Sequence, residues 1–162
     1  MKKTTSSLLK LLLTLALVIT ALLPQRAEAA TASLSGSGTV QAGSTVKLTL
    51  SVSGSGIMGV DATLDYDSSV LEFTNYDNQL SGWTMVNDGM KFVLYGVDPI
   101  SSSSVLSVTF RVKSNLDAGT ALSASFKNIT VSDGTADTSL SPASWSGKVD
   151  APPVSYTHLT LP

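Results

Sequence analysis

The chain has 162 residues, no cysteine and a formal net charge of −2, and 14% of its residues are charged. Without cysteine it has no disulfide staples and none of the usual zinc or thiol chemistry. A weakly charged, slightly acidic chain also argues against nucleic acid or an anionic membrane surface as a partner.

The first 29 residues are predicted to be a secretory signal peptide. Lys2 and Lys3 precede a leucine-rich run over residues 8–23, and residues 27–29 (AEA) offer a small-residue cleavage site. The apolar run is shorter than the ~20 residues that a membrane-spanning helix needs. We therefore expect a secreted protein, extracellular or at the cell surface, that is not inserted in a membrane once the signal is cleaved.

Residues 30–149 are predicted to form one β-sandwich domain. Apolar and polar side chains alternate with the period of two that is typical of half-buried strands, and turn residues separate the segments. The predicted strands are residues 32–35, 45–53, 59–66, 71–76, 83–86, 90–97, 105–112, 121–131 and 144–149, with loops at 53–56 (SGSG) and 101–104 (SSSS). Nine short strands without a sustained helical period indicate an all-β fold, a nine-stranded antiparallel β-sandwich.

The alternation also predicts which side chains form the core. The inward phase of the strands contains Leu48, Leu50, Leu64, Phe73, Val108 and Phe110. Trp83 and Trp145 are expected to be partly buried at the ends of the sheets. After the domain, residues 150–153 are interpreted as the start of a proline-rich linker, and residues 154–162 as an adaptor-derived or disordered tail.

Catalytic chemistry is poorly represented, so the protein is not expected to be an enzyme. The single histidine, His158, lies in the predicted tail, which removes Ser-His-Asp arrangements. Asp61 and Asp65 lie four residues apart on one strand, about 13 Å at ~3.3 Å per residue, which is too far for a glycosidase pair. The aspartates near residues 65–67 and 133–137 lack the EF-hand spacing and are interpreted as turn residues, so no metal and no cofactor is expected.

A family resemblance lies in residues 59–73, GVDATLDYDSSVLEF. An aspartate in an alternating strand (Asp61) is followed by Tyr66-Asp67, two serines and residues 70–72 (VLE). This segment resembles the cohesin module of bacterial cellulosome scaffoldins, and the resemblance extends over about residues 32–149. It implies a jelly-roll topology and a non-catalytic module that binds dockerin, a helical partner that carries the calcium itself.

The same resemblance, together with the strand alternation, predicts the partner-binding residues. Asp61 matches the family position that hydrogen-bonds the partner, although Gly59 and Val97 stand where the family often has polar and acidic residues. Alternation places the partner-binding candidates on one outer face: Asp61, Thr63, Asp65, Val93, Tyr95 and Val97. Apolar side chains left outside a sheet tend to mark interaction sites.

Three functions remain open from the sequence. The first is protein docking to a dockerin-type partner, in an extracellular polysaccharide-degrading or cell-surface assembly. The second is a carbohydrate-binding module with polysaccharide as partner, which would need a coplanar row of exposed aromatic rings. The third is a structural spacer of a surface protein, for which a uniformly Ser/Thr-covered face is expected.

Overall fold

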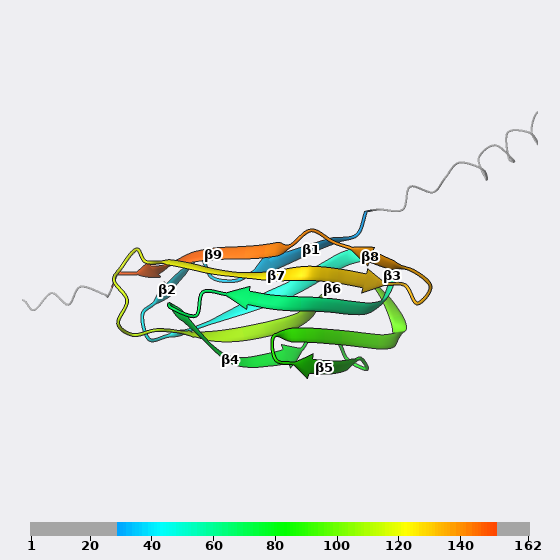
Figure 1. The fold of residues 1–162 in the computed structure, drawn as a ribbon, viewed down its shortest axis with the longest axis horizontal. Helices are drawn as coiled ribbons and strands as arrows, with labels where there is room; N and C mark the ends of the chain where they lie inside the picture. The colour runs from blue at the N-terminus through cyan, green and yellow to red at the C-terminus, as the bar shows by residue number, and fades with distance from the viewer. Residues whose placement is uncertain (1–28, 152–162) are drawn as a thin grey trace, which may run out of the picture.

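The computed structural model describes residues 29–151. Residues 1–28 of the predicted signal peptide and the whole predicted tail lie outside the described residues, as does the end of the predicted linker. The described part folds as a flattened β-sandwich whose strands run close to its long axis (Figure 1). No helix in residues 29–151 is long and apolar enough to cross a membrane.

Nine strands make up the fold, which confirms the all-β sandwich. They are β1 (Thr31–Ser35), β2 (Thr39–Gln41), β3 (Thr45–Tyr66), β4 (Leu71–Asn78), β5 (Thr84–Asp88), β6 (Lys91–Val112), β7 (Ala121–Ser132), β8 (Asp137–Ser139) and β9 (Ala143–Asp150). One layer contains β5, the first part of β6, the second part of β3, β7 and β9. The other contains β1, the first part of β3, the second part of β6, and β4.

Two strands, β3 and β6, pass through both layers, and this corrects two predicted loops. Each has 22 residues. Residues 53–56 lie within β3 and residues 101–104 within β6, and the two segments run beside each other, with Ser53 opposite Ser102. Shifts of register after Leu50 and after Ser53 bend the paired strands from one layer to the other. Small residues such as serine and glycine suit this bend. The two segments therefore form continuous strand although their composition is typical of loops.

The strand count agrees with the prediction although two of the strands differ. Joining two predicted pairs into β3 and β6 removes two strands, and the short strands β2 and β8, which were not predicted, restore the number. β2 pairs with β9 in parallel, whereas every other strand pair in the described residues is antiparallel. The wholly antiparallel prediction is therefore wrong for this one pair.

A bulge in β7 corrects the prediction of unbroken alternation over residues 121–131. Phe126 and Ile129 are both buried although they are three residues apart. Between them Asn128 adopts a positive φ of 50°, and the register against β3 shifts. Asparagine tolerates this left-handed conformation better than most residues, because its short side chain can hydrogen-bond locally. The extra residue keeps apolar side chains inward on both sides of the bulge.

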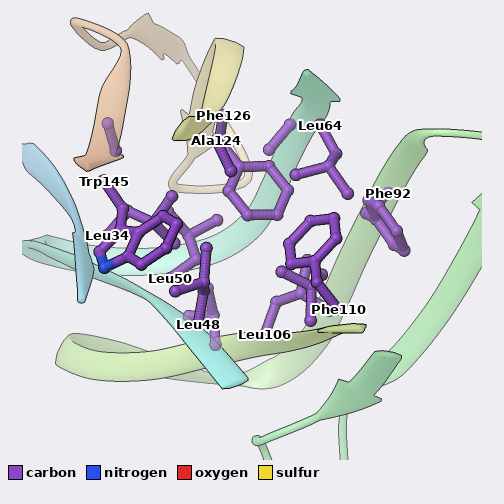
Figure 2. Packing of buried hydrophobic residues seen from close by; sticks show 14 of the residues in the cluster. Leu34, Leu48, Leu50, Leu64, Phe92, Leu106, Phe110, Ala124, Phe126 and Trp145 are labelled. Carbon is purple, nitrogen blue, oxygen red and sulfur yellow. The ribbon is translucent and has the colours of Figure 1, made fainter. Parts of the chain in front are cut away.

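The core lies between the two layers and matches the predicted set with one exception. Leu48, Leu50, Leu64, Val108 and Phe110 are buried, and rings from both layers face one another there (Figure 2). Phe73 is only half-buried, because β4 is an edge strand with a bulge immediately after this residue. Trp83 and Trp145 are more completely buried than predicted.

Candidate functional site

The outer surface of the layer formed by β5, β6, β3, β7 and β9 carries the predicted binding residues. Asp61 lies between Val93 of β6 and Thr130 of β7, and Thr63 lies between Lys91 of β6 and Lys127 of β7. We call this surface the mixed face. It is defined by Asp61, Thr63, Asp65, Val86, Lys91, Val93, Tyr95, Val97 and Lys127.

The apolar part of the mixed face lies over β5 and β6. Val86 and Tyr95 are each 51% exposed and Val97 is 82% exposed, while Val93 between them is half-buried. Val86 pairs directly with Val93. Exposing large apolar side chains to water is unfavourable. A contiguous exposed group of this kind is therefore typical of an interaction surface.

The strand below this apolar group is supported from the core side by Trp83. A Cβ atom on Gly96 would lie 2.5 Å from the indole, so the ring rests on the bare backbone between Tyr95 and Val97. The indole Nε1 also donates a hydrogen bond to the carbonyl of Asp98, at 3.2 Å. The tryptophan therefore packs against the core side of β6 at this point, while the side chains of Tyr95 and Val97 on either side are exposed.

The charged part of the mixed face consists of two ion pairs on either side of Thr63. Nζ of Lys91 lies 2.9 Å from Oδ2 of Asp61, and Lys127 pairs with Asp65. The hydrogen bond from Lys91 to Asp61, together with the attraction of that carboxylate, raises the pKa of the lysine. Each of the two aspartates is therefore paired with a lysine of a neighbouring strand.

A shallow hollow adjoins the mixed face where β3 ends. It has a volume of about 510 Å³ and is lined by Asp65, Asp67 and outward serines of β7 and β9, namely Ser123, Ser125, Ser144 and Ser146. Serine side chains are short, so the sheet surface is lower here than beside the lysines. We call this feature the serine hollow.

The turn aspartates use their side chains to build their own turns. Asp67 Oδ1 accepts hydrogen bonds from the backbone and the hydroxyl of Ser69, and Asp133 Oδ1 accepts equivalent bonds from Thr135. These bonds lower the pKa of both carboxyls. Residues 29–151 contain no group of three or more His, Cys, Asp or Glu side chains placed to hold a metal ion.

The outer surface of the other layer has a different chemistry. Its outward positions on β3 and β6 include Thr49, Ser51 and Thr109, and its ion pair, Lys47 with Asp77 at 3.9 Å, is a loose one. The surface is thus covered mainly by serine, threonine and scattered charges. Among residues 29–151, exposed large apolar side chains and close ion pairs occur together on the mixed face and not on this one.

The structure brings Asp61, Thr63, Asp65, Val93 and Tyr95 together on the mixed face, and Val97 continues the same side of β6. Their role in binding stays a prediction. The sequence reasoning missed Lys91, Lys127 and Val86. Lys91 lies two residues before Val93 on the same face of its strand, so alternation could have identified it. Which residues lie beside Lys127 and Val86 depends on strand register, which local alternation does not define.

The described residues provide no row of exposed aromatic rings for stacking on sugars. Trp83 and Trp145 are buried, and Tyr66, Phe73 and Tyr76 are partly buried against the core. Among the described aromatic side chains, Tyr95 alone is mostly exposed.

The described residues form an all-β sandwich with one mixed outer face, and comparison with known proteins identifies the family. The model of the cohesin domain matches residues 30–151, so the chain belongs to the cohesin family. Members of this family are binding modules without catalytic activity, and the match supports a dockerin-binding module. No curated protein matches the chain.

Solved cohesins share the fold at low sequence identity. A cohesin module of a family 33 glycoside hydrolase from Clostridium perfringens has a TM-score of 0.66 and 11% identity, with 75% of this chain and 96% of that chain covered. A non-cellulosomal cohesin from the archaeon Archaeoglobus fulgidus has a TM-score of 0.56 and 13% identity, with 75% and 92% covered. A chain of a CaDoc–CaCohA2 complex has a TM-score of 0.55 and 18% identity, with 75% and 100% covered.

Proposed function

We propose that this protein is a secreted, non-catalytic cohesin module that docks a dockerin-type partner through its mixed face. The setting would be an extracellular polysaccharide-degrading or cell-surface assembly. The observation that carries the proposal is the difference between the two outer faces. One face joins the exposed Val86, Tyr95 and Val97 to the ion-paired Asp61 and Lys91, whereas the other is mostly Ser and Thr.

The mixed face has the composition that protein interfaces favour. Tyrosine is enriched among the residues that dominate binding energy, and apolar neighbours that exclude water strengthen its contribution. Val93 and Val86 lie side by side next to Tyr95, and Trp83 packs against the core side of β6 one residue after Tyr95, at Gly96. A partner helix laid on this surface would bury these side chains without rearrangement of the sheet.

Asp61 supplies the polar contact of the proposed interface. One of its carboxylate oxygens bonds Lys91, which orients the side chain, and its side chain remains 34% exposed. Covering this group on docking removes water from a charge, so the partner has to supply a hydrogen bond in return. Loss of such a contact at an interface typically costs about 2–5 kcal/mol.

Polysaccharide binding is the competing proposal, and burial of both tryptophans weighs against it. Stacking on sugar rings requires exposed aromatic faces, and a lone Tyr95 on a strand does not form a platform. The spacer proposal fits the Ser/Thr-covered face but leaves the exposed apolar group of the mixed face unexplained.

Calorimetric titration with dockerins encoded in the same genome tests the proposal. Asp61→Ala and Tyr95→Ala should each weaken binding at least tenfold while the melting temperature stays close to that of the unaltered protein. Asp77→Ala is the matched control, because it removes the carboxylate of the lysine pair on the opposite face. Cellulose and xylan pull-downs run in parallel. Binding of polysaccharide that survives both substitutions, with no dockerin bound by the unaltered protein, would reject docking.

A further inference from the structure

The charged side chains of the mixed face form a cross centred on Thr63. Asp61 and Asp65 lie two residues before and after it on β3. Lys91 of β6 and Lys127 of β7 lie directly beside it. At ~3.3 Å per residue and ~4.8 Å between strands, the acidic positions stand about 7 Å from the centre and the basic positions about 5 Å. Negative charge therefore follows the strand direction, and positive charge follows the perpendicular direction.

A charge cross of this kind is complementary to itself after a quarter turn. When a second copy lies face to face with the first and its strands run at about 90° to those below, the two aspartates of each copy come over the two lysines of the other. Near right angles are one of the two arrangements in which sheets pack face to face. The arms of the cross differ by about 2 Å, which the flexible four-carbon stem of a lysine can span.

The apolar group decides between the two possible quarter turns. Val93 lies beside Asp61 across the sheet and two residues after Lys91 along β6, and Val86 lies beside Val93 on β5. The group thus occupies the quadrant between these two arms. A two-fold axis along the diagonal of this quadrant brings Asp61 of each copy over the other copy's Lys91, and lays the two apolar groups on each other. The opposite quarter turn also matches the charges, but it lays the apolar group over Ser125 at the polar corner.

We propose that this protein self-associates as a symmetric dimer through the mixed face, with the two sheets crossed at about 90°. Burial of Val86, Val93 and Tyr95 supplies the favourable free energy. The ion pairs already exist within each copy and their lysine side chains are 53% exposed, so their main effect is on orientation. Other orientations would place like charges over one another, which is unfavourable. The same patch meets itself, as a two-fold dimer requires.

The size of the mixed face indicates a weak dimer. Five strands at ~4.8 Å spacing, over about 20 Å of their length, cover on the order of 500 Å² per copy, less than the ~800 Å² per partner of a standard interface. A third carboxylate, Asp88, is exposed on β5 beside Lys91 and leaves the face with more acidic than basic groups. The dimer would cover the docking surface, so a second copy and a dockerin would compete for it.

Sedimentation velocity at protein concentrations from about 10 μM to about 1 mM measures the association. We expect the average mass to rise toward that of a dimer. Val86→Lys places a charge beside the same residue of the second copy and should weaken association at least tenfold. Val86 is 51% exposed on an edge strand, so the fold should tolerate the change, and thermal melting verifies this. Ser33→Lys is the matched control, because it adds the same charge at an exposed position of β1 in the other layer.

An inverted cross tests the geometry itself. One variant exchanges all five signs and keeps each intramolecular pair: Asp61→Lys, Asp65→Lys, Asp88→Lys, Lys91→Asp and Lys127→Asp. It should associate with itself, because the inverted cross is still complementary after a quarter turn. It should not associate with the unaltered protein, because like charges then meet. Isotope-labelled unaltered protein is titrated with either unlabelled form, and amide shifts around Thr63 should appear with the unaltered form alone.

Each result supports or overturns the dimer. A protein that stays monomeric at every concentration overturns it, as does a Val86→Lys variant that associates like Ser33→Lys. Equal association of the unaltered protein with itself and with the inverted variant overturns the crossed arrangement. Titration with the dockerins of the same genome separates this inference from the proposed function. A dimer that binds no dockerin rejects docking alone, whereas a monomer that binds dockerin rejects the dimer alone.

Discussion

The indole of Trp83 lies against the backbone of Gly96, so close that a Cβ atom there would come within 2.5 Å of the ring. The contact joins the β4–β5 connection to the strand that presents Tyr95 and Val97. The tryptophan fills the core side of β6 at this point, while Tyr95 and Val97 on either side of Gly96 are exposed on the outer side.

Gly96→Ala should destabilise the protein by about 1–3 kcal/mol, because a methyl group cannot fit without moving the indole. Chemical denaturation measures this change. Gly38→Ala is the control, since a Cβ atom at Gly38 would meet nothing within 4 Å and the φ of this glycine is not in the positive range. Equal stabilities of the two variants would contradict the close contact.

Leu64→Ala should lower the free energy of unfolding by about 2–5 kcal/mol, through lost burial and the cavity left behind. Leu64 is buried on the core side of β3, whereas the adjacent Thr63 faces outward between two lysines. Thr63→Ala should therefore change the denaturation midpoint far less. A midpoint unaffected by Leu64→Ala would show that the register of β3 is wrong.

Phe110→Ala and Phe73→Ala should differ although their rings are in contact, with centroids 5.9 Å apart. Phe110 is fully buried and its loss should cost about 3–5 kcal/mol. Phe73 lies half-buried on an edge strand, so water can fill part of the space its ring leaves. Denaturation curves should show a larger loss of stability for Phe110→Ala than for Phe73→Ala. The reverse order would contradict the edge position of β4.

Stability should fall in acid partly because of the two aspartate turns. Hydrogen bonds from Ser69 and Thr135 hold the pKa values of Asp67 and Asp133 below the usual 3.8. The stability that these two carboxylates contribute is therefore fully present above their pKa in the unfolded chain. It is lost as the pH falls through their lower pKa values in the folded protein. Melting temperatures measured from pH 5 to pH 2 should fall less steeply for the double variant Asp67→Asn, Asp133→Asn. An unchanged slope would contradict the lowered pKa values.

Much of the fold was predictable because each strand repeats a local pattern. Alternation alone placed Leu48, Leu50 and Leu64 inward and Asp61 and Tyr95 outward, and the structure agrees. The prediction failed where the amino-acid composition suggested a loop but the backbone forms a strand. The serine-rich segments of β3 and β6 have the composition of loops, yet each is paired with the other as the strands cross between layers.

The residues themselves determine the alternating faces, the turn aspartates and the family motif around Asp61, because these features depend on near neighbours in the chain. The tertiary structure decided which lysine meets which aspartate, how Trp83 supports the apolar group and where the serine hollow opens. These features join residues that lie from 13 to more than 60 positions apart. A shift of one residue in strand register would exchange every side chain between the core and the surface, and only the packed pair of layers determines that register.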